Sequence, residues 1–408
     1  MNPTLEAVKK GRMNDLDEVC IKVQPIIKDI KQNGDKALFK YIEKFDKIRD
    51  RKIRVSKEEQ KAALQRVDKD TVAAIVEAKK NVEKYAKLQM PKEWQKEILK
   101  GVRIGQLVKP LDSIGCYVPG GNFPLVSTVI MTVVPAKVAG VKKVIVCTPK
   151  DNDALYAACF ICGADIVYRV GGAQAIAALA FGTESIDKVD KIVGPGNIYV
   201  TAAKKLVNGD VGIDFLAGPS EIMIIAEYGN ASFIAADMIA QAEHDEMASA
   251  ILVTTDKKLA NDVKYELKRQ DKSEMAEKSL DKYGKIIVAK DVNEACRLAN
   301  EFAPEHLEII VKDKKKVISQ LNNFGALFIG EYSPEAAGDY CSGPNHVLPT
   351  GGVSRYRSGL SVMDFLKVPT IQELSKEGLK KLGKSIEKLA WLEGLSGHKR
   401  SVAIRTKY

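Results

Sequence analysis

The chain has 408 residues, enough for two or three domains with buried cores. Its 45% hydrophobic and 28% charged residues are typical of a globular protein and exclude a disordered or collagen-like chain. The net charge of +10 arises within residues 1–110, where 27 basic residues accompany 17 acidic ones. Because the two signs are interspersed there, and no zinc-finger spacing or RNA-binding signature accompanies them, we interpret this segment as solvated helix surface and expect no nucleic-acid partner.

Seven cysteines are scattered through apolar segments, and this odd number argues against a disulfide framework. Cys159 and Cys162 form a C-x-x-C pair, but no second pair completes a zinc site, so we predict ordinary core thiols. The segment 1–15 lacks the apolar stretch of a signal peptide, and the most apolar run, 125–134, is too short to span a bilayer. We therefore expect a soluble cytoplasmic protein without a membrane partner.

In chain order, the first pattern is helical. Apolar residues recur at three- and four-residue spacing between Val19 and Ala86 and predict a run of surface helices. From about Gly101 the pattern changes to an alternating segment and then to short β-branched runs, each followed by a helical pattern. The alternating segment is 102–110. The expected strands are 113–118, 143–148 and 165–170, and the expected helices are 125–139, 153–162 and 174–181. Strands that alternate with helices in this way predict βαβ units and a parallel sheet.

A second series of the same kind begins at Glu221. Its expected strands are 221–226, 250–254, 284–288, 307–311 and 325–329, and its expected helices are 231–243, 259–269 and 292–302. We therefore predict an α/β protein with two parallel-sheet layers. Beyond about Val362 the pattern is helical and charged again, and it ends in a strand-like segment, 402–406.

Only four histidines occur, all in the second half of the chain, and each lies near an acid or an amide in the sequence. Gln241 precedes His244 by one helical turn, so both side chains can point at one centre. Glu305 and His306 stand where a helix ends and a strand begins, a place where an imidazole can exchange a proton and a carboxylate can polarise water. Taken alone, each pair is also explained by a satisfied helix end or a turn.

The other two histidines lie in irregular segments. Asp339 and His346 bracket a loop rich in Gly, Pro, Ser and Asn, which are plain turn formers as well as possible site residues. Glu393 and His398 lie near the C-terminus, where glycines at 394 and 397 are expected to break the helix.

Three glycine turns each follow an expected strand, at 119–122, 171–174 and 194–197. Such a turn can let the backbone approach a phosphate. None of the three is a G-x-G-x-x-G or Walker A motif, so from spacing alone a tight βα turn explains them equally well.

Taken together, these segments resemble the histidinol dehydrogenase family. The resemblance rests on the motifs YVPGG at 117–121, GGAQAI at 171–176, VGPGN at 193–197, AGPSE at 217–221, QAEH at 241–244, APEHLE at 303–308, the segment 338–349 and the segment 393–398. They occur in family order and span about 70% of the chain, from 117 to 398. Cys341 and Pro344 stand where members commonly have Ala and Thr, which affects the wall of the loop and no metal ligand.

The resemblance implies a zinc-containing, NAD-dependent enzyme. It would oxidise L-histidinol to L-histidine through L-histidinaldehyde, in two hydride transfers that complete histidine biosynthesis. Carried over by position, the zinc ligands would be Gln241, His244, Asp339 and His398. His306 would be the general base for the alcohol, and Glu305 would activate the water that adds to the aldehyde.

The resemblance also implies the remaining site residues. NAD would contact Tyr117, Gln174 and Asn197, in incomplete Rossmann-like folds that hold the cofactor weakly. The substrate pocket would be lined by the metal ligands, the base and three further side chains. In chain order these are Ser220, Gln241, His244, His306, Asp339, His346, Glu393 and His398.

Finally, the resemblance implies an intertwined homodimer, in which the C-terminal segment of one subunit completes the active site of the other. On that basis we expect a helical dimer contact at 1–20. Residues 21–108 and 222–360 would form the first Rossmann-like domain, with the catalytic and metal residues, and 109–221 the second, which binds NAD. Residues 361–408 would form a helical tail that serves the partner.

Three alternatives stay open on the sequence. The first is a related dehydrogenase of another small alcohol, such as a sulfonated diol. The second is a zinc hydrolase, because His and carboxylate ligands beside a Glu-His pair can also activate water. The third is a basic binding module formed by residues 1–110. The presence of Glu393 together with His346 favours an amino alcohol that carries an imidazole.

Overall fold

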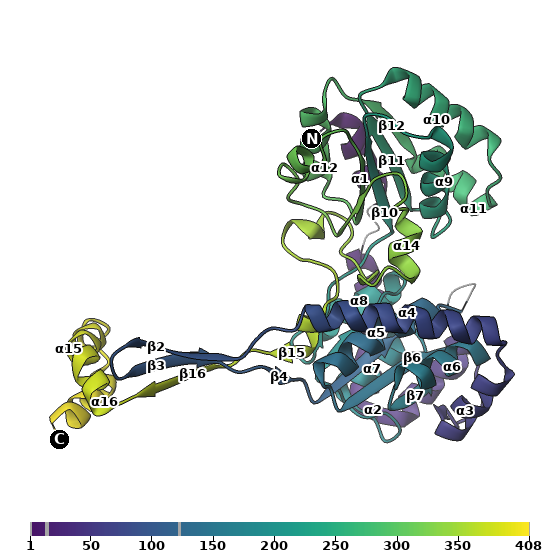
Figure 1. The fold of residues 1–408 in the computed structure, drawn as a ribbon. Helices are drawn as coiled ribbons and strands as arrows, with labels where there is room; N and C mark the ends of the chain where they lie inside the picture. The colour runs from purple at the N-terminus through teal and green to yellow at the C-terminus, as the bar shows by residue number, and fades with distance from the viewer. Residues whose placement is uncertain (1, 13–15, 121–123, 408) are drawn as a thin grey trace.

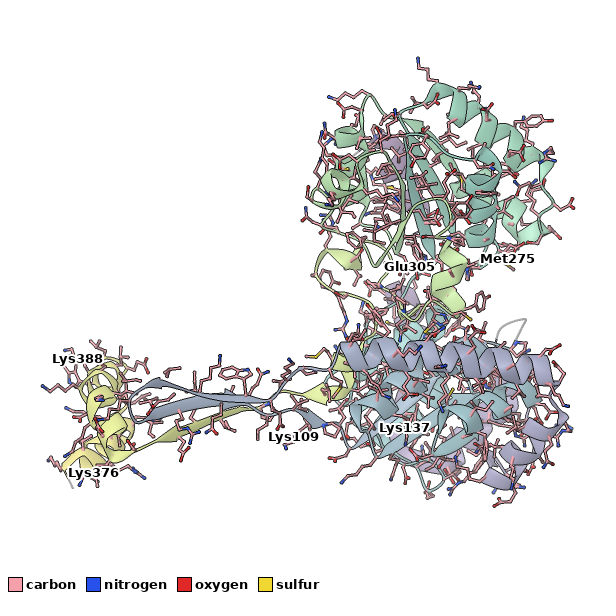
Figure 2. All side chains as sticks on the ribbon, viewed as in Figure 1. Lys109, Lys137, Met275, Glu305, Lys376 and Lys388 are labelled. Carbon is pink, nitrogen blue, oxygen red and sulfur yellow. The ribbon has the colours of Figure 1, made fainter. Side chains whose placement is uncertain are left out.

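Two α/β lobes and a long arm make up the protein (Figure 1). The computed structural model describes residues 2–12, 16–120 and 124–407. Each lobe is a sheet covered by helices on both faces, which confirms the predicted α/β fold with two parallel-sheet layers. Within each lobe the side chains are densely packed, whereas the side chains of the arm project outward from it (Figure 2).

The first lobe contains a six-stranded sheet with the order β1-β7-β6-β5-β8-β9. Its strands are β1 (Arg54–Val55), β5 (Ser113–Tyr117), β6 (Lys143–Thr148), β7 (Ile166–Arg169), β8 (Lys191–Val193) and β9 (Gly212–Ile213). All neighbours run parallel except β1, which pairs antiparallel with β7. The five parallel strands follow the order 3-2-1-4-5 of a Rossmann-type sheet that lacks its sixth strand.

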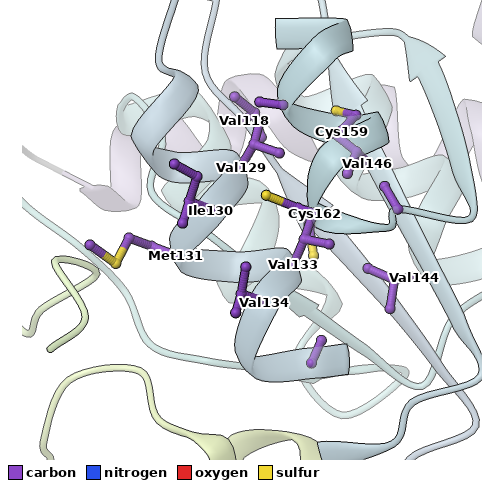
Figure 3. Packing of buried hydrophobic residues seen from close by; sticks show 14 of the residues in the cluster. Val118, Val129, Ile130, Met131, Val133, Val134, Val144, Val146, Cys159 and Cys162 are labelled. Atoms are coloured by element: carbon purple, nitrogen blue, oxygen red, sulfur yellow. The ribbon is translucent and has the colours of Figure 1, made fainter. Parts of the chain in front are cut away.

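Two groups of helices cover this sheet. On one face lie α2 (Leu16–Tyr41), α7 (Gly172–Phe181) and α8 (Ile198–Val207); on the other lie α3 (Lys57–Arg66), α4 (Lys69–Leu88), α5 (Val126–Ala139) and α6 (Asp153–Cys162). Figure 3 shows side chains of α5, α6 and β6 that meet in the core between the sheet and the second group of helices, among them Val133, Val144 and Cys162. Cys159 and Cys162 are buried free thiols in this core, as predicted.

The helices α2 to α4 lie on the six-stranded sheet, which corrects the expected grouping of 21–108 with 222–360. Leu38 of α2 packs in the core with α7 and α8, and Ile75 of α4 packs in the core with α5. Val55 of β1 extends the same sheet. An amphipathic helix shows in its sequence which face it buries but not which sheet receives that face, so the spacing could not assign these helices to a lobe.

The second lobe contains a five-stranded parallel sheet with the order β12-β11-β10-β13-β14, again 3-2-1-4-5 in chain order. Its strands are β10 (Glu221–Ala226), β11 (Ser249–Thr254), β12 (Lys285–Val288), β13 (His306–Ile310) and β14 (Ala326–Ile329). One face carries α9 (Ala231–Ala242), α10 (Lys257–Arg269) and α11 (Glu274–Tyr283). The other carries α1 (Pro3–Arg12), α12 (Val292–Phe302) and α13 (Lys314–Ile318).

The helix α1 is part of this second lobe although α2 belongs to the first. Leu5 and Val8 of α1 are buried in the core formed by β10, β13 and α12. In this chain the segment 3–12 therefore serves as a cover for the five-stranded sheet, and the expected dimer contact of residues 1–20 stays a prediction.

The arm is built from segments far apart in the sequence. At its base, β4 (Lys109–Pro110) pairs with β15 (Leu366–Lys367), and further out β2 (Trp94–Leu99), β3 (Val102–Gln106) and β16 (Thr370–Leu374) form an antiparallel sheet. The helices α15 (Lys376–Leu392) and α16 (Ser396–Lys407) form its tip (Figure 1). In the described ranges no helix is long and apolar enough to cross a membrane.

The predicted strand at 402–406 is wrong, because this segment lies inside α16. Val402 and Thr406 stand one helical turn apart, and a Cβ built on Gly383 of α15 would lie 3.6 Å from the first and 3.0 Å from the second. β-branched residues at every second position resembled a strand, yet this helix-to-helix packing overrides their propensity. Gly394, with φ near +72°, does end α15 as expected, but Gly397 lies within α16.

The lobes meet through opposite edges of their sheets. In the first sheet, Tyr117 ends β5 and Gly194 follows β8, so both lie at the carboxyl edge. In the second, Glu221 opens β10 and His306 opens β13, so both lie at the amino edge, which faces the first lobe beside α14 (Glu335–Tyr340; Figure 1). Across this junction the Asn345 side-chain amide donates to the carbonyl of a residue on α5, at 2.6 Å.

Candidate active site between the two lobes

Glu305 and His306 are fixed by the turn that joins α12 to β13. Ala303 ends α12 in the left-handed conformation, with φ near +54°, which is strained for a residue with a Cβ. The Ser354 hydroxyl donates to the Ala303 carbonyl at 2.7 Å and helps to hold the turn. Glu305 and His306 are then buried, with 5% and 3% of their surfaces exposed. Glu305 lies at the end of its lobe that faces the other lobe (Figure 2).

The imidazole of His306 lies between oxygen atoms that fix its protonation. Its Nδ1 is 3.2 Å from the backbone carbonyl of Glu221 and 3.0 Å from Oε1 of Gln241. Since a carbonyl can only accept, Nδ1 carries the hydrogen in the neutral ring and Nε2 keeps its lone pair. Nε2 lies 3.8 Å from Oδ1 of Asp339, so the basic nitrogen is the one directed toward the acidic side of the site.

The carboxyl group of Glu305 has a pKa near neutrality. Burial raises the pKa of Glu305 to about 7, although the neighbouring His306 and the Glu221 N–H favour the charged form. Oε2 of Glu305 accepts a hydrogen bond from that N–H at 2.9 Å and lies 3.9 Å from Nδ1 of His306. A carboxyl with such a pKa can take and return a proton at the pH of the cell.

A cluster suited to a metal ion lies beside this pair. Nε2 of His244 is 3.5 Å from Oδ2 of Asp339 and 3.7 Å from Oε1 of Glu335, and one ligand atom of each residue lies within 4.8 Å of the others. His244 follows the end of α9, and the two acids lie four residues apart on one face of α14. Asp339, and then Glu335, raise the pKa of His244 to about 10, so this position favours a positive charge.

The chemistry of the cluster fits a divalent cation. Gln241, in the last turn of α9, is fully buried; its Oε1 faces His306, and its Nε2 has no hydrogen-bond partner among the described residues. In the part of the chain that the structure describes, Oε1 of Glu335 is likewise buried without a hydrogen-bond partner. Buried polar atoms are rarely left unpaired, and imidazole, carboxylate and amide oxygen are ligands that zinc accepts. The structure thus brings the expected ligands His244 and Asp339 together and places Gln241 against His306, whose ring lies 3.8 Å from Asp339.

The sequence pattern did not identify Glu335 as a site residue. It is 1% exposed and lies between two histidines, with Oε1 3.7 Å from Nε2 of His244 and 3.9 Å from Nδ1 of His306. The available signal was its position four residues before Asp339, which places both carboxylates on one helical face. That spacing carries information only if the segment is a helix, whereas its Gly, Pro and Ser neighbours indicated a loop.

His346 and Ser220 lie at the margin of the cluster. Nδ1 of His346 is 2.8 Å from the backbone carbonyl of Asp339, and its Nε2 is 3.5 Å from the hydroxyl of Thr128 on α5. Burial lowers the pKa of His346, which favours the neutral ring. The ring therefore connects the lobes beside a metal-competent residue. Ser220 is half-buried directly before Glu221, at the mouth of β10.

Glu393 and His398 do not join the cluster in this chain. Both are exposed, the first at the end of α15 and the second in α16, at the tip of the arm (Figures 1 and 2). Three of the four histidines therefore gather within one subunit, at 244, 306 and 346. That all four form one site stays a prediction that needs a second subunit.

The three expected NAD contacts lie along the carboxyl edge of the six-stranded sheet. The Tyr117 hydroxyl accepts a hydrogen bond from the N–H of Gly172 at 3.0 Å, which ties the end of β5 to the start of α7. Gln174 is buried in the first turn of α7. Asn197 is exposed and caps α8, its Oδ1 accepting from two backbone N–H groups at 3.1 Å.

A buried ion pair holds the turn that carries Asn197. Lys204 and Asp214 form this pair, with side chains 4% and 0% exposed. Asp214 accepts from the N–H of Gly194 at 2.8 Å, and Lys204 donates to the carbonyl of the same residue at 2.8 Å. A Cβ on Gly194 would lie 2.2 Å from the Tyr117 carbonyl, so only glycine fits this close approach.

Two Rossmann-type sheets, with a buried Glu–His pair and a metal-competent cluster between them, have the architecture of an α/β enzyme. The family model described as histidinol dehydrogenase matches residues 9–406. The chain belongs to this family.

Individual relatives give the same result. Histidinol dehydrogenase of Methanothermobacter thermautotrophicus is 46% identical over 98% of this chain and 96% of its own length. Its counterpart in Clostridium acetobutylicum is 47% identical with the same coverage. The crystal structure of histidinol dehydrogenase from Elizabethkingia anophelis superposes with a TM-score of 0.92, at 39% identity over 97% of this chain and 93% of that one.

The position of Glu335 predicts a role in metal binding. Changing Glu335→Gln keeps the shape but removes a charge 3.7 Å from His244, so we expect zinc affinity to fall by about tenfold, as is usual when a residue that supports a metal ligand is lost. Competition with a chromophoric chelator measures this affinity. Glu243→Gln, on an exposed side chain at the same helix end, is the control and should bind zinc as the wild type does. Equal affinities for all three proteins would contradict the prediction.

Proposed function

We propose that this protein oxidises L-histidinol to L-histidine through L-histidinaldehyde, with two molecules of NAD, in the final steps of histidine biosynthesis. The observation that supports this most strongly is the buried Glu305–His306 pair beside the His244, Glu335 and Asp339 cluster, in a chain of the histidinol dehydrogenase family. The free cysteines in the described residues suit a reducing cytoplasm, where we place the reaction.

His306 is the proposed base for the oxidation of the alcohol. Its Nε2 takes the hydroxyl proton of the alcohol as carbon releases a hydride. The Glu221 carbonyl and the Gln241 amide oxygen, both at Nδ1, stabilise the imidazolium that results. Glu305 then takes a proton from the water that adds to the aldehyde, which gives the hydrate that loses the second hydride. The net reaction consumes one water and forms one carboxylate.

The metal and the cofactor are proposed as zinc and NAD. Zinc would be held by Gln241, His244, Asp339 and the partner subunit's His398, and it supplies a fixed positive charge that orients the amino alcohol. NAD would accept the hydrides while held along the carboxyl edge of the six-stranded sheet by Tyr117, Gln174 and Asn197.

The remaining substrate contacts are proposed at the margins of the cluster. Ser220 and His346 would contact the substrate from the same chain as the catalytic pair. Glu393 would come from the arm of a second subunit in a homodimer and accept the N–H of the substrate imidazole. The exposed apolar side chains of the arm tip, Leu389, Trp391 and Leu392, support a docked tip, because three large apolar residues rarely stand together in solvent.

The proposal predicts a fixed stoichiometry. With L-histidinol and NAD, we expect about two NADH per L-histidine, because alcohol and aldehyde are oxidised in turn. A coupled absorbance assay together with amino-acid analysis measures both products. Activity should be lost after chelation and return with zinc.

Three outcomes would contradict it. Product formed without nicotinamide would favour the zinc hydrolase. Turnover of sulfonated diols but not of L-histidinol would favour the related dehydrogenase. Binding of DNA or RNA that weakens with salt, without any turnover, would favour the basic binding module.

The raised pKa of Glu305 predicts a pH dependence for the second step. Glu305 must be ionised to take a proton from water, and its pKa is about 7, so aldehyde oxidation should rise as the pH increases through 7 and then level off. Rates with L-histidinaldehyde as the starting substrate isolate this step. Glu305→Gln should lower the rate by about a hundredfold or more and remove the rise. A rise of equal size in the variant would show that another group is responsible.

The shared site predicts complementation between inactive subunits. Dimers of Glu305→Ala chains lack the water-activating group, and dimers of His398→Ala chains lack the donated ligand. When the two are mixed and re-paired, a heterodimer has one site with both defects and one site intact. We expect activity to return toward a quarter of the wild-type value, measured as NADH formation. No recovery, with heterodimers demonstrated by mass, would show that each site is built from one chain.

A further inference from the structure

Asp46 lies in a segment to which no motif drew attention. It ends a π-helical turn, η1 (Ile42–Asp46), that follows α2, and Lys47 then reverses the chain with φ near +60°. π-helical turns are rare, and a positive φ is rare for a residue that has a Cβ. Both features tend to occur at functional sites. The Asp46 side chain is half-buried against the first turn of α7, far along the chain.

One oxygen of Asp46 holds two groups of that turn. Oδ2 accepts a hydrogen bond from the N–H of Gly171 at 3.1 Å and another from Nε2 of Gln174 at 3.1 Å. Gly171 is the N-cap of α7, and Asp46 supplies from another element the acceptor for its N–H that an N3 Glu or Gln supplies in a capping box. The charge of the carboxylate also suits the positive end of the helix.

The contact with Gln174 fixes which end of its amide is free. Gln174 is 1% exposed, and within 2–12, 16–120 and 124–407 its side chain makes this one hydrogen bond. A carboxylate can only accept, so the atom that faces Asp46 is the NH₂ group. The carbonyl oxygen, Oε1, is then left for a ligand. Asp46 also packs closely against the turn, since a Cβ on Gly171 would lie 2.7 Å from Pro149 and 3.0 Å from Oδ1 of Asp46.

We propose that Asp46 is a positioning residue for the nicotinamide cofactor, which orients the amide of Gln174 so that Oε1 accepts a hydrogen bond from the bound dinucleotide. The inference rests on the proposed function, which places NAD at Gln174. The group recognised is an N–H or O–H donor, such as the carboxamide NH₂ or a ribose hydroxyl of NAD. Asp46 acts only through Gln174 and the Gly171 turn, and it takes no part in proton or hydride transfer.

The test is a split between binding and turnover. In Asp46→Ala, Gln174 loses its fixed partner, and we expect the KM for NAD to rise by about tenfold, the usual effect of losing one hydrogen bond to a charged group. The kcat at saturating NAD, the KM for L-histidinol and the zinc content should stay within about twofold of the wild type, because none depends on Gln174. Asp46→Asn, which keeps size and packing, should raise the KM for NAD less.

Matched controls separate this role from a general loss of structure. Asp50→Asn changes a nearby carboxylate whose side chain is 64% exposed, and it should leave the KM for NAD unchanged. Gln174→Ala should raise that KM at least as much as Asp46→Ala does. If Asp46 acts through Gln174, the double variant should be no worse than Gln174→Ala alone, because the two effects share one pathway.

Each result decides the question. A normal KM for NAD in Asp46→Ala, with a raised one in Gln174→Ala, would overturn the role of Asp46 and leave the proposed function intact. Fully additive effects would also overturn it, since Asp46 would then act independently of Gln174. A normal KM in Gln174→Ala would overturn the placement of NAD itself and the inference with it. If Asp46→Ala does not fold, Asp46→Asn, compared by circular dichroism and kinetics, provides the same comparison.

Discussion

The burial of ionisable groups at the amino edge of the five-stranded sheet is the constraint on which this molecule depends. Glu305, His306, Glu335 and Asp339 are each less than a tenth exposed. Charges removed from water are costly unless they are paired, and here three carboxyl groups surround His306 and the more exposed His244. Burial alone would lower the pKa of His306, but the three carboxyls raise it above its ordinary value. A bound cation would relieve the remaining negative excess.

The topology explains how this cluster meets a cofactor site. Both sheets have the strand order 3-2-1-4-5, yet they contribute opposite edges to the junction. The first sheet presents its carboxyl edge, where glycine turns follow the strands and a dinucleotide is normally held. The second presents its amino edge, where strands begin and His306 is the first residue of β13. One lobe can thus bind the hydride acceptor while the other supplies base, water-activating carboxyl and ligands to the same space.

The sequence predicted what depends on local pattern. The five strands of the second sheet, the first three parallel strands of the first sheet and the position of the Glu305–His306 pair follow from hydrophobic period, and the Gln241–His244 pair follows from spacing along one helix. The sequence did not predict the short strands β1, β8 and β9. It could not predict pairings set by distant segments. The arm strand at 94–99 is exposed along its whole length, so it shows no buried alternation. Glu335 gains meaning only once α14 is known to be helical, and Asp46 only once α2 is placed against α7.

We infer that a divalent cation completes the buried cluster of carboxylates and imidazoles. The most direct measurement is a zinc titration of chelator-treated protein, with the thermal unfolding midpoint recorded at each step and the bound metal counted. We expect the midpoint to rise until one zinc is bound per subunit, and His244→Ala and Asp339→Asn to abolish the rise. A wild-type midpoint that does not respond to zinc, in protein that turns over L-histidinol without metal, would contradict it.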